Sequence, residues 1–154
     1  MDKDTKTDVS EQAQFVQHLD ELVRGGARQM IEQAVHAELQ QLLDSYGNVR
    51  LLDGRRAVVR NGYLPERQVL TGAGGIAVCV PKVRDRSGRG IKFNSRIVPP
   101  YVRRSPRVSA ALPWLYLKGV STGDMKPALE VLLGDDAKGL SPAVISRLKA
   151  NWAD

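Results

Sequence analysis

The sequence predicts a mainly α-helical protein with one small β-hairpin, and three observations support this fold class. Apolar residues recur at every third or fourth position over residues 11–46 and again over the last third of the chain. Two β-branched runs flank a glycine cluster in the middle third. We therefore expect an amphipathic helical segment at 1–47, a basic segment with a β-hairpin at 48–104, and a helix-turn-helix-like unit of three helices at 105–154.

The N-terminal segment predicts a pair of amphipathic helices. Its periodic apolar residues are Phe15, Val16, Leu19, Leu22, Val23, Ala27, Met30, Ile31, Ala34, Val35, Leu39, Leu42 and Leu43. Gly25-Gly26 is expected to separate the two helices, because a glycine inside a helix costs about 1 kcal/mol relative to alanine. Tyr46-Gly47-Asn48 should end the second helix. We expect this apolar stripe to pack into the protein core. The alternative is that the two helices form a dimerisation arm and the stripe contacts a second copy of the chain.

The middle segment predicts a hairpin between Arg67–Thr71 and Ile76–Val80, since Gly72–Gly75 can adopt the positive φ values of a tight turn. A phosphate-binding loop is disfavoured because strand-like residues follow the glycines and no lysine-serine pair closes the motif. Residues 48–62 are interpreted as loop or extended chain. Cys79 should lie on the second strand as a small buried side chain.

Three helices are predicted in the last third. Ser105-Pro106 supplies a cap and a first-turn proline for a helix ending near Gly119, and Pro113 either kinks or restarts it. Asp124 should cap a second helix that ends at Gly134. Ser141-Pro142 should begin a third that runs to about Trp152, with Val144, Ile145, Leu148 and Trp152 on its apolar side.

The charge is concentrated in the middle of the chain. The net charge is −5 over residues 1–49, +11 over 50–107 and 0 over 108–154. A dense block of arginine and lysine is typical of a protein that binds a polyanion, because each cation near a phosphate releases condensed counterions. Nucleic acid is the favoured partner, and a solvated basic surface or an acidic protein or lipid partner remains the alternative.

The candidate DNA-binding residues form two groups. The phosphate-binding candidates are Arg60, Arg84, Arg86, Arg89, Lys92, Arg103 and Arg104. The last helix carries Arg147 and Asn151, side chain types that reach base edges in the major groove, with Ser146 and Lys149 beside them. Aromatic residues are too sparse for a single-strand stacking platform, which favours duplex DNA. An ordinary surface helix is the alternative, because the preceding loop is long and carries Asp135-Asp136.

Several classes of protein are disfavoured. The single cysteine allows no internal disulfide, and Cys79, His18 and His36 have no zinc-ligand spacing, so we expect no metal in this segment. No apolar run is long enough to span a membrane, and the N-terminus has no apolar signal segment. We expect a cytoplasmic protein associated with the nucleoid.

Four ordered blocks of the sequence carry a family resemblance. They are Val59–Tyr63, Val80–Arg86, Tyr116–Asp124 and Leu140–Leu148. In order and spacing they resemble the N-terminal region of Mutator-type bacterial insertion-sequence transposases. The resemblance covers about residues 20–154.

The resemblance implies that this region recognises terminal inverted repeats of an insertion element. It also implies a following ribonuclease-H-like domain in which an Asp-Asp-Glu triad binds two Mg²⁺ ions for phosphodiester transfer. No triad residue is identified here, so we expect the catalytic domain to be absent from this truncated chain and assign no catalytic residue or cofactor.

Two other functions remain open. In the first, the chain is an active nuclease or strand-transfer enzyme by itself. In the second, it is a transposase remnant that forms homo-oligomers through residues 11–46 and inhibits the full-length enzyme. Metal-dependent cleavage would favour the first, and association without DNA binding would favour the second.

Overall fold

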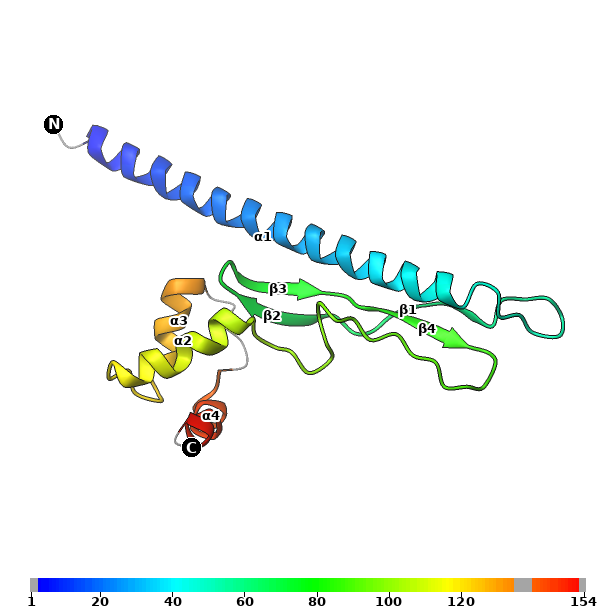
Figure 1. The fold of residues 1–154 in the computed structure, drawn as a ribbon. Coiled ribbons are helices and arrows are strands. Elements are labelled where there is room, and N and C mark those ends of the chain that lie inside the picture. The colour runs from blue at the N-terminus through cyan, green and yellow to red at the C-terminus, as the bar shows by residue number, and fades with distance from the viewer. Residues whose placement is uncertain (1–2, 135–139, 153–154) are drawn as a thin grey trace.

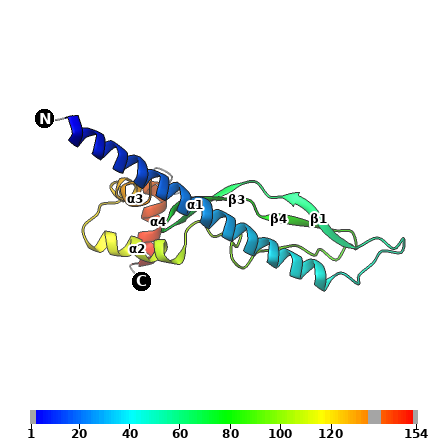
Figure 2. The ribbon, with the colours of Figure 1, turned by 90° about the horizontal axis from the view of Figure 1, so that it is seen from above.

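The computed structural model describes residues 3–134 and 140–152, which form an elongated molecule (Figure 1). The long helix α1 (Lys3–Ser45) extends over the strands, and the short helices gather at one end, away from β1 and β4 (Figures 1 and 2). The remaining elements are β1 (Val58–Tyr63), β2 (Arg67–Thr71), β3 (Gly74–Val78), β4 (Pro81–Asp85), α2 (Pro106–Leu117), α3 (Met125–Leu133) and α4 (Pro142–Trp152).

The predicted break at Gly25-Gly26 is wrong, because α1 is one continuous helix. Beyond the glycine pair, Val35, Leu39 and Leu43 are buried against the strands. Just before it, the side chain of Arg24 lies beside the β2–β3 turn. We infer that packing on both sides of the pair offsets the cost of two glycines inside the helix.

The strands form two antiparallel two-stranded sheets, β1–β4 and β2–β3. The predicted hairpin is present, with Thr71 opposite Gly74 and a turn of Gly72-Ala73, and its second strand begins and ends two residues earlier than expected. The second sheet was not predicted: β1 falls at the end of the expected loop, and β4 falls in the basic segment after the predicted hairpin, where no strand was expected. Cys79 follows β3 and is only half-buried, with its thiol donating to Glu66.

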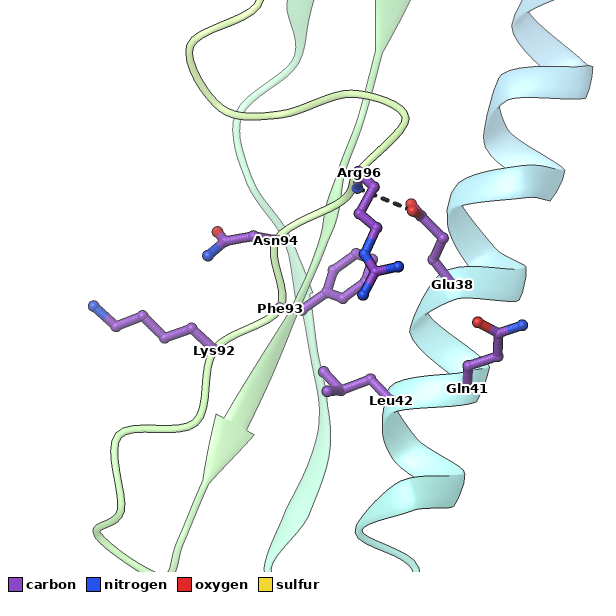
Figure 3. Close-up of a pocket in the computed structure, with 7 residues that line it drawn as sticks. All are labelled: Glu38, Gln41, Leu42, Lys92, Phe93, Asn94 and Arg96. Atoms are coloured by element: carbon purple, nitrogen blue, oxygen red, sulfur yellow. Dashed lines mark hydrogen bonds between the residues drawn. The ribbon is translucent and has the colours of Figure 1, made fainter.

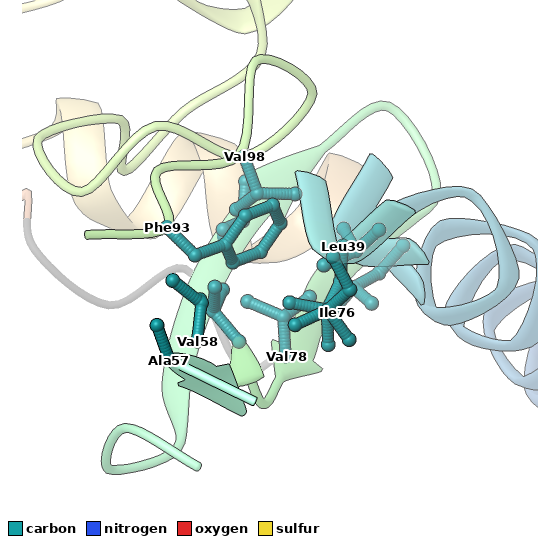
Figure 4. Packing of buried hydrophobic residues seen from close by; sticks show 11 residues of the cluster. Leu39, Ala57, Val58, Ile76, Val78, Phe93 and Val98 are labelled. Carbon is teal, nitrogen blue, oxygen red and sulfur yellow. The ribbon is translucent and has the colours of Figure 1, made fainter. Parts of the chain in front are cut away.

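The larger core lies between α1 and the strands (Figure 4). Leu39 of α1 meets Val58 of β1 and Ile76 and Val78 of β3, and the loop after β4 adds Phe93. Burying each of these side chains contributes roughly 1.5–3 kcal/mol. This core joins the two sheets to the C-terminal half of α1.

A second core holds the three short helices together. Val108 and Leu112 of α2 pack with Met125 and Leu129 of α3 and with Ile145 of α4. Leu70 of β2 also belongs to this cluster. The helical unit is therefore anchored on the edge of the β2–β3 hairpin.

The caps of the short helices match the predictions in two of three cases. Ser105 and Ser141 accept hydrogen bonds from the amides of Val108 and Val144. Asp124 makes no side-chain cap; instead Ser121, three residues earlier, accepts from the Asp124 amide. α2 continues through Pro113 as one helix. The expected acidic loop with Asp135-Asp136 lies outside the described residues.

Within the described ranges, no helix combines sufficient length with enough apolar character to cross a lipid bilayer.

Candidate nucleic-acid interface

A groove of about 590 Å³ lies between the segment after β4, α2 and α4. We call it the basic groove. It is lined by Tyr101, Val102, Arg103, Arg104, Ser109, Val144, Arg147, Leu148 and Asn151. Four of the predicted DNA-binding residues, from two segments more than forty positions apart, therefore line one surface, and none of the described lining residues is acidic.

Backbone pairing with β2 fixes one wall of the basic groove. The amide of Leu70 donates to the Arg103 carbonyl at 2.9 Å, and the amide of Ser105 donates to the Leu70 carbonyl at 2.8 Å. Arg104 lies between these two bonds, in a parallel bridge with Leu70. The buried side chain of Leu70 packs with α2 and α4, so one residue sets the position of both walls.

Arg67 holds the segment that leads into the groove. Its guanidinium donates to the carbonyls of Val98 at 2.9 Å and Pro99 at 2.6 Å, and also to the Val102 carbonyl. Burial lowers the pKa of Arg67 below its ordinary value, and the nearby charge of Arg103 lowers it further. Hydrogen bonds from a charged donor are the stronger ones, so Arg67 fixes this turn firmly.

Arg104 has a buried donor without a partner. Its Nε is inaccessible to solvent and makes no hydrogen bond within the described part of the chain. Desolvation by burial lowers the pKa of Arg104, although a guanidinium stays charged at neutral pH. A buried cationic donor left unsatisfied is costly, so this placement of Arg104 lowers the stability of the fold.

Helix α4 presents Arg147 and Asn151 to the same groove. The two residues are four positions apart, which places them on one side of a helix. Ile145 faces the other way and is fully buried. Ile145, Leu148 and Trp152 join the second core as predicted, but Val144 and Leu148 also line the groove beside Arg147 and Asn151. The predicted division of this helix into apolar and polar faces is therefore confirmed only in part. Ser146 is exposed beside the groove without lining it.

Lys149 lies apart from Arg147 and Asn151. Its ammonium group stacks over the ring of Tyr116, 4.5 Å from the ring centroid, and donates to the Thr122 hydroxyl at 3.2 Å. These contacts tie α4 to α2 and to the loop before α3. Among the predicted interface residues, Lys149 therefore has a clear structural role.

The other predicted phosphate-binding residues lie at the opposite end of the molecule. Arg60 is on β1, Arg84 is on β4, and Arg86 and Arg89 follow β4. Lys92 lines a separate pocket of about 400 Å³ beside Glu38 and points away from α1 (Figure 3). None of these five residues lines the basic groove with α4. In Figure 1, α4 lies at one end of the molecule, and β1 and β4 lie toward the other.

Sequence reasoning missed Arg67 and Ser109. Arg67 is the first residue of β2 and its only charged residue. A cation in such a strand needs a specific partner, and this feature of the sequence could have identified Arg67 as a structural residue. Ser109 lies on the exposed side of α2 and gave no signal that distinguishes it from a surface residue.

The described residues do not fit the magnesium site that the family resemblance implies. They contain no cluster of three histidine, cysteine, aspartate or glutamate side chains that could hold a metal ion. No catalytic step is therefore derived from these residues.

Comparison with known proteins identifies relatives of one kind. The family model described as "Transposase, Mutator family" matches residues 1–154. The transposase for insertion sequence element ISRM3 of Rhizobium meliloti is 33% identical over 115 residues, covering 75% of this chain and 26% of that protein.

Two further relatives match over shorter segments. The transposase for IS6120 of Mycolicibacterium smegmatis is 53% identical over 47 residues, 30% of this chain and 14% of that protein. The transposase for IST2 of Acidithiobacillus ferrooxidans is 72% identical over 29 residues, 19% of this chain and 10% of that protein. The chain therefore spans about a quarter or less of the length of the curated relatives it matches.

Proposed function

Because this chain belongs to the Mutator family of transposases, we propose that it is a DNA-binding part of such an enzyme and recognises the terminal inverted repeats of its insertion element. The basic groove is the binding site. The observation that carries the proposal is the convergence of Arg103, Arg104 and Arg147 on one groove whose described lining contains no acidic side chain. Such a protein acts in the cytoplasm, at the nucleoid.

In the proposed complex, α3 and α4 act as a helix-turn-helix-like pair and α4 enters the major groove. Arg147 and Asn151 read base edges, because an arginine matches guanine and an asparagine matches adenine with two hydrogen bonds. Arg103 and Arg104 bind the adjacent phosphates, which orient the helix without reading sequence. Ser146 supports the contact from the edge of the groove.

The test compares duplexes that carry the element's own terminal repeats with shuffled duplexes. Arg147→Ala is expected to lower the preference for the repeats by about 10-fold to 100-fold, the range for losing one bidentate base contact. Arg103→Ala should weaken binding to both duplexes and reduce the slope of log affinity against log salt by about 0.9 per lost phosphate contact. Arg103→Ala with Arg104→Ala should reduce that slope further.

Lys126→Ala is the matched control, since it removes an equal charge from α3 outside the groove. If wild-type protein binds both duplexes equally and its affinity does not fall with salt, the proposed function is wrong.

A second candidate function is association with another copy of the chain through α1. Large apolar side chains over residues 15–30 of this helix are exposed, among them Phe15 at 72%, Leu22 at 69% and Met30 at 70%. Acidic Asp20 and Glu21 precede basic Arg24 and Arg28 along this stretch, so antiparallel pairing of two copies would place opposite charges together. Such pairing would let a partial chain inhibit a full-length enzyme.

Sedimentation of the protein without DNA tests this second candidate. Leu19→Ser with Leu22→Ser should convert a dimer to a monomer, and Gln29→Ser on the same helix is the control. A wild-type protein that sediments as a monomer at all concentrations excludes pairing through α1.

A further inference from the structure

Two loops carry a cluster of arginines at the end of the molecule away from the basic groove. One loop connects α1 to β1, and the other follows β4. Together with the end of β4 they present Arg50, Arg55, Arg56, Arg84, Arg86 and Arg89, all of them exposed. We call this cluster the arginine tip.

The first loop is a tight hairpin with a defined backbone. The amide of Leu51 donates to the Arg55 carbonyl at 2.8 Å, and the amide of Gly54 donates to the Leu51 carbonyl at 2.9 Å. Gly54 has a φ of +86°, a value that favours glycine. Asp53 accepts from the amide and the Nε of Arg55 at 3.0 and 2.7 Å. The hairpin is therefore ordered before any partner binds.

The second loop folds around Asp85. One carboxylate oxygen of Asp85 accepts from the amide and hydroxyl of Ser87, and the other accepts from the amide of Ile91 at 3.1 Å. The amide of Arg86 donates to the Ala57 carbonyl at 2.8 Å, which joins this loop to the end of the first hairpin. The two loops form one surface.

The positive charge of the arginine tip is largely uncompensated. Asp53 pairs with Arg55, whose hydrogen bonds lower the pKa of Asp53 most, and the charge of Arg86 lowers it further. Asp85 accepts hydrogen bonds from Ser87, from the Ile91 amide and from the backbone of Arg89. Arg56, Arg86 and Arg89 have no carboxylate within 4.0 Å among the described residues. Several exposed guanidinium groups on an ordered scaffold are suited to bind the phosphates of a nucleic-acid backbone.

The apex of the hairpin is apolar. Leu52 is fully exposed to solvent, between Arg50 and Arg55. Proteins that insert a hairpin or arm into a DNA groove combine arginines with an apolar side chain at the point of contact. Leu52 and its neighbouring arginines have this combination.

The chain between the basic groove and the arginine tip is long enough to span at most about one turn of DNA. Leu70, at the groove, pairs with Gly75, and the extended chain from Gly75 to Asp85 covers roughly 33 Å at about 3.3 Å per residue. One turn of duplex DNA measures about 34–36 Å. In Figure 1, α4 and the loop after β4 both lie on the side of the strands away from α1.

We propose that the arginine tip is a second DNA-binding surface that holds the same duplex about one helical turn from the basic groove, with Leu52 inserted in a groove and the arginines on the flanking phosphates. The proposal rests on the proposed function, since it assumes that the basic groove holds duplex DNA. In the proposed complex, the basic groove reads the DNA sequence and the arginine tip binds DNA without reading its sequence.

The test measures affinity for a short duplex of about 12 base pairs and a long one of about 26, which is long enough for both surfaces. Wild-type protein should bind the long duplex more tightly. In the variant Arg56→Gln, Arg86→Gln, Arg89→Gln, this gain should be lost. Raising salt from about 50 to about 200 mM should weaken wild-type binding to the long duplex about 40-fold more than variant binding, as expected for three lost phosphate contacts.

Two further variants isolate the contributions. Arg28→Gln, Lys118→Gln, Lys126→Gln removes the same charge outside both surfaces and should keep the gain with length. Leu52→Ser should weaken binding to the long duplex without changing the salt slope, because it removes no charge.

The outcomes separate this proposal from the proposed function. Wild-type protein that binds neither duplex contradicts the proposed function. If wild-type protein binds and Arg103→Ala weakens binding, but the arginine-tip variant behaves like its charge-matched control on the long duplex, only the second surface is wrong. If one protein molecule brings two labelled short duplexes close enough for energy transfer, and the long duplex binds no more tightly than the short one, then the two surfaces hold separate duplexes and the placement on a single duplex is wrong.

Discussion

Glu38, near the C-terminal end of α1, accepts a hydrogen bond at 2.5 Å from the buried hydroxyl of Ser95, which lies 57 positions later in the chain. A second oxygen of Glu38 accepts from the Arg96 amide at 2.9 Å (Figure 3). The Ser95 oxygen in turn accepts from the amides of Ile97 and Val98. One carboxylate therefore fixes the loop after β4 against the long helix.

We expect Glu38→Ala and Ser95→Ala each to lower the free energy of unfolding by about 1–2 kcal/mol, because each leaves polar groups without partners. Since the two residues contact each other, the double variant should cost less than the sum of the two. Chemical denaturation measures all three variants. Gln41→Ala, an exposed position on the same helix, is the control, and strictly additive effects would show that the bond contributes nothing.

Gly74, at the start of β3, packs against the end of α3. A Cβ at this position would lie 2.7 Å from the backbone oxygen of Leu133, and Gly74 has a φ of +102°. Gly74→Ala should therefore lower the free energy of unfolding by more than about 1 kcal/mol. Gly72→Ala is a matched control in the same turn, because a Cβ there meets no atom within 4 Å and its φ is not in the left-handed region. Equal melting temperatures for the two variants would contradict the close packing.

The sequence was sufficient where local chemistry decides the structure. Ser105 and Ser141 cap their helices as predicted, and the face of α4 with Arg147 and Asn151 lies opposite the buried Ile145. The glycine pair in α1 misled the prediction because a local propensity of about 1 kcal/mol per residue is smaller than the tertiary packing along the helix.

Long-range pairing could not be predicted. β1 and β4 are separated by the β2–β3 hairpin, and no local pattern in Val58–Tyr63 specifies Pro81–Asp85 as its partner. The same pairing carries Arg84 and Arg86 to the end of the molecule away from Arg147, so a basic block that is continuous in sequence becomes two surfaces. Charge counted along the chain indicates an acidic partner, but only the fold shows that the basic residues lie on two separate surfaces.

Arg67 is expected to affect DNA binding only indirectly, by holding the segment that carries Arg103 and Arg104 in place. Arg67→Ala removes hydrogen bonds to the carbonyls of Val98, Pro99 and Val102, and should lower the free energy of unfolding by about 2 kcal/mol. It should also weaken discrimination between the terminal repeats and shuffled DNA, because Arg103 and Arg104 would no longer hold phosphates in the place that orients α4 for base contacts. Arg67→Lys should recover part of the stability and less of the discrimination, since a lysine cannot reach three carbonyls in one plane.

Arg96→Ala provides the comparison for Arg67, because only the backbone amide of Arg96 takes part in a described hydrogen bond. It should leave both stability and discrimination near the wild-type values. If Arg67→Ala and Arg96→Ala discriminate equally well, Arg67 has no role in shaping the groove.

Asp85 should give the loop of the arginine tip a defined response to acid. The hydrogen bond from the Ser87 side chain, followed by that from the Ile91 amide, lowers the pKa of Asp85 from 3.8 to about 2. A group with a lowered pKa in the folded state stabilises the protein when ionised, so this contribution is complete above the ordinary value of 3.8 and is lost as the pH falls toward 2.

The amide resonances of Ser87 and Ile91 should therefore shift together with a midpoint near 2. In Ser87→Ala, which removes the largest cause, the Ile91 midpoint should move upward toward 3.8. An unchanged midpoint in that variant would mean that Ser87 does not hold the carboxylate, and the ordered second loop of the arginine tip would lose its main support.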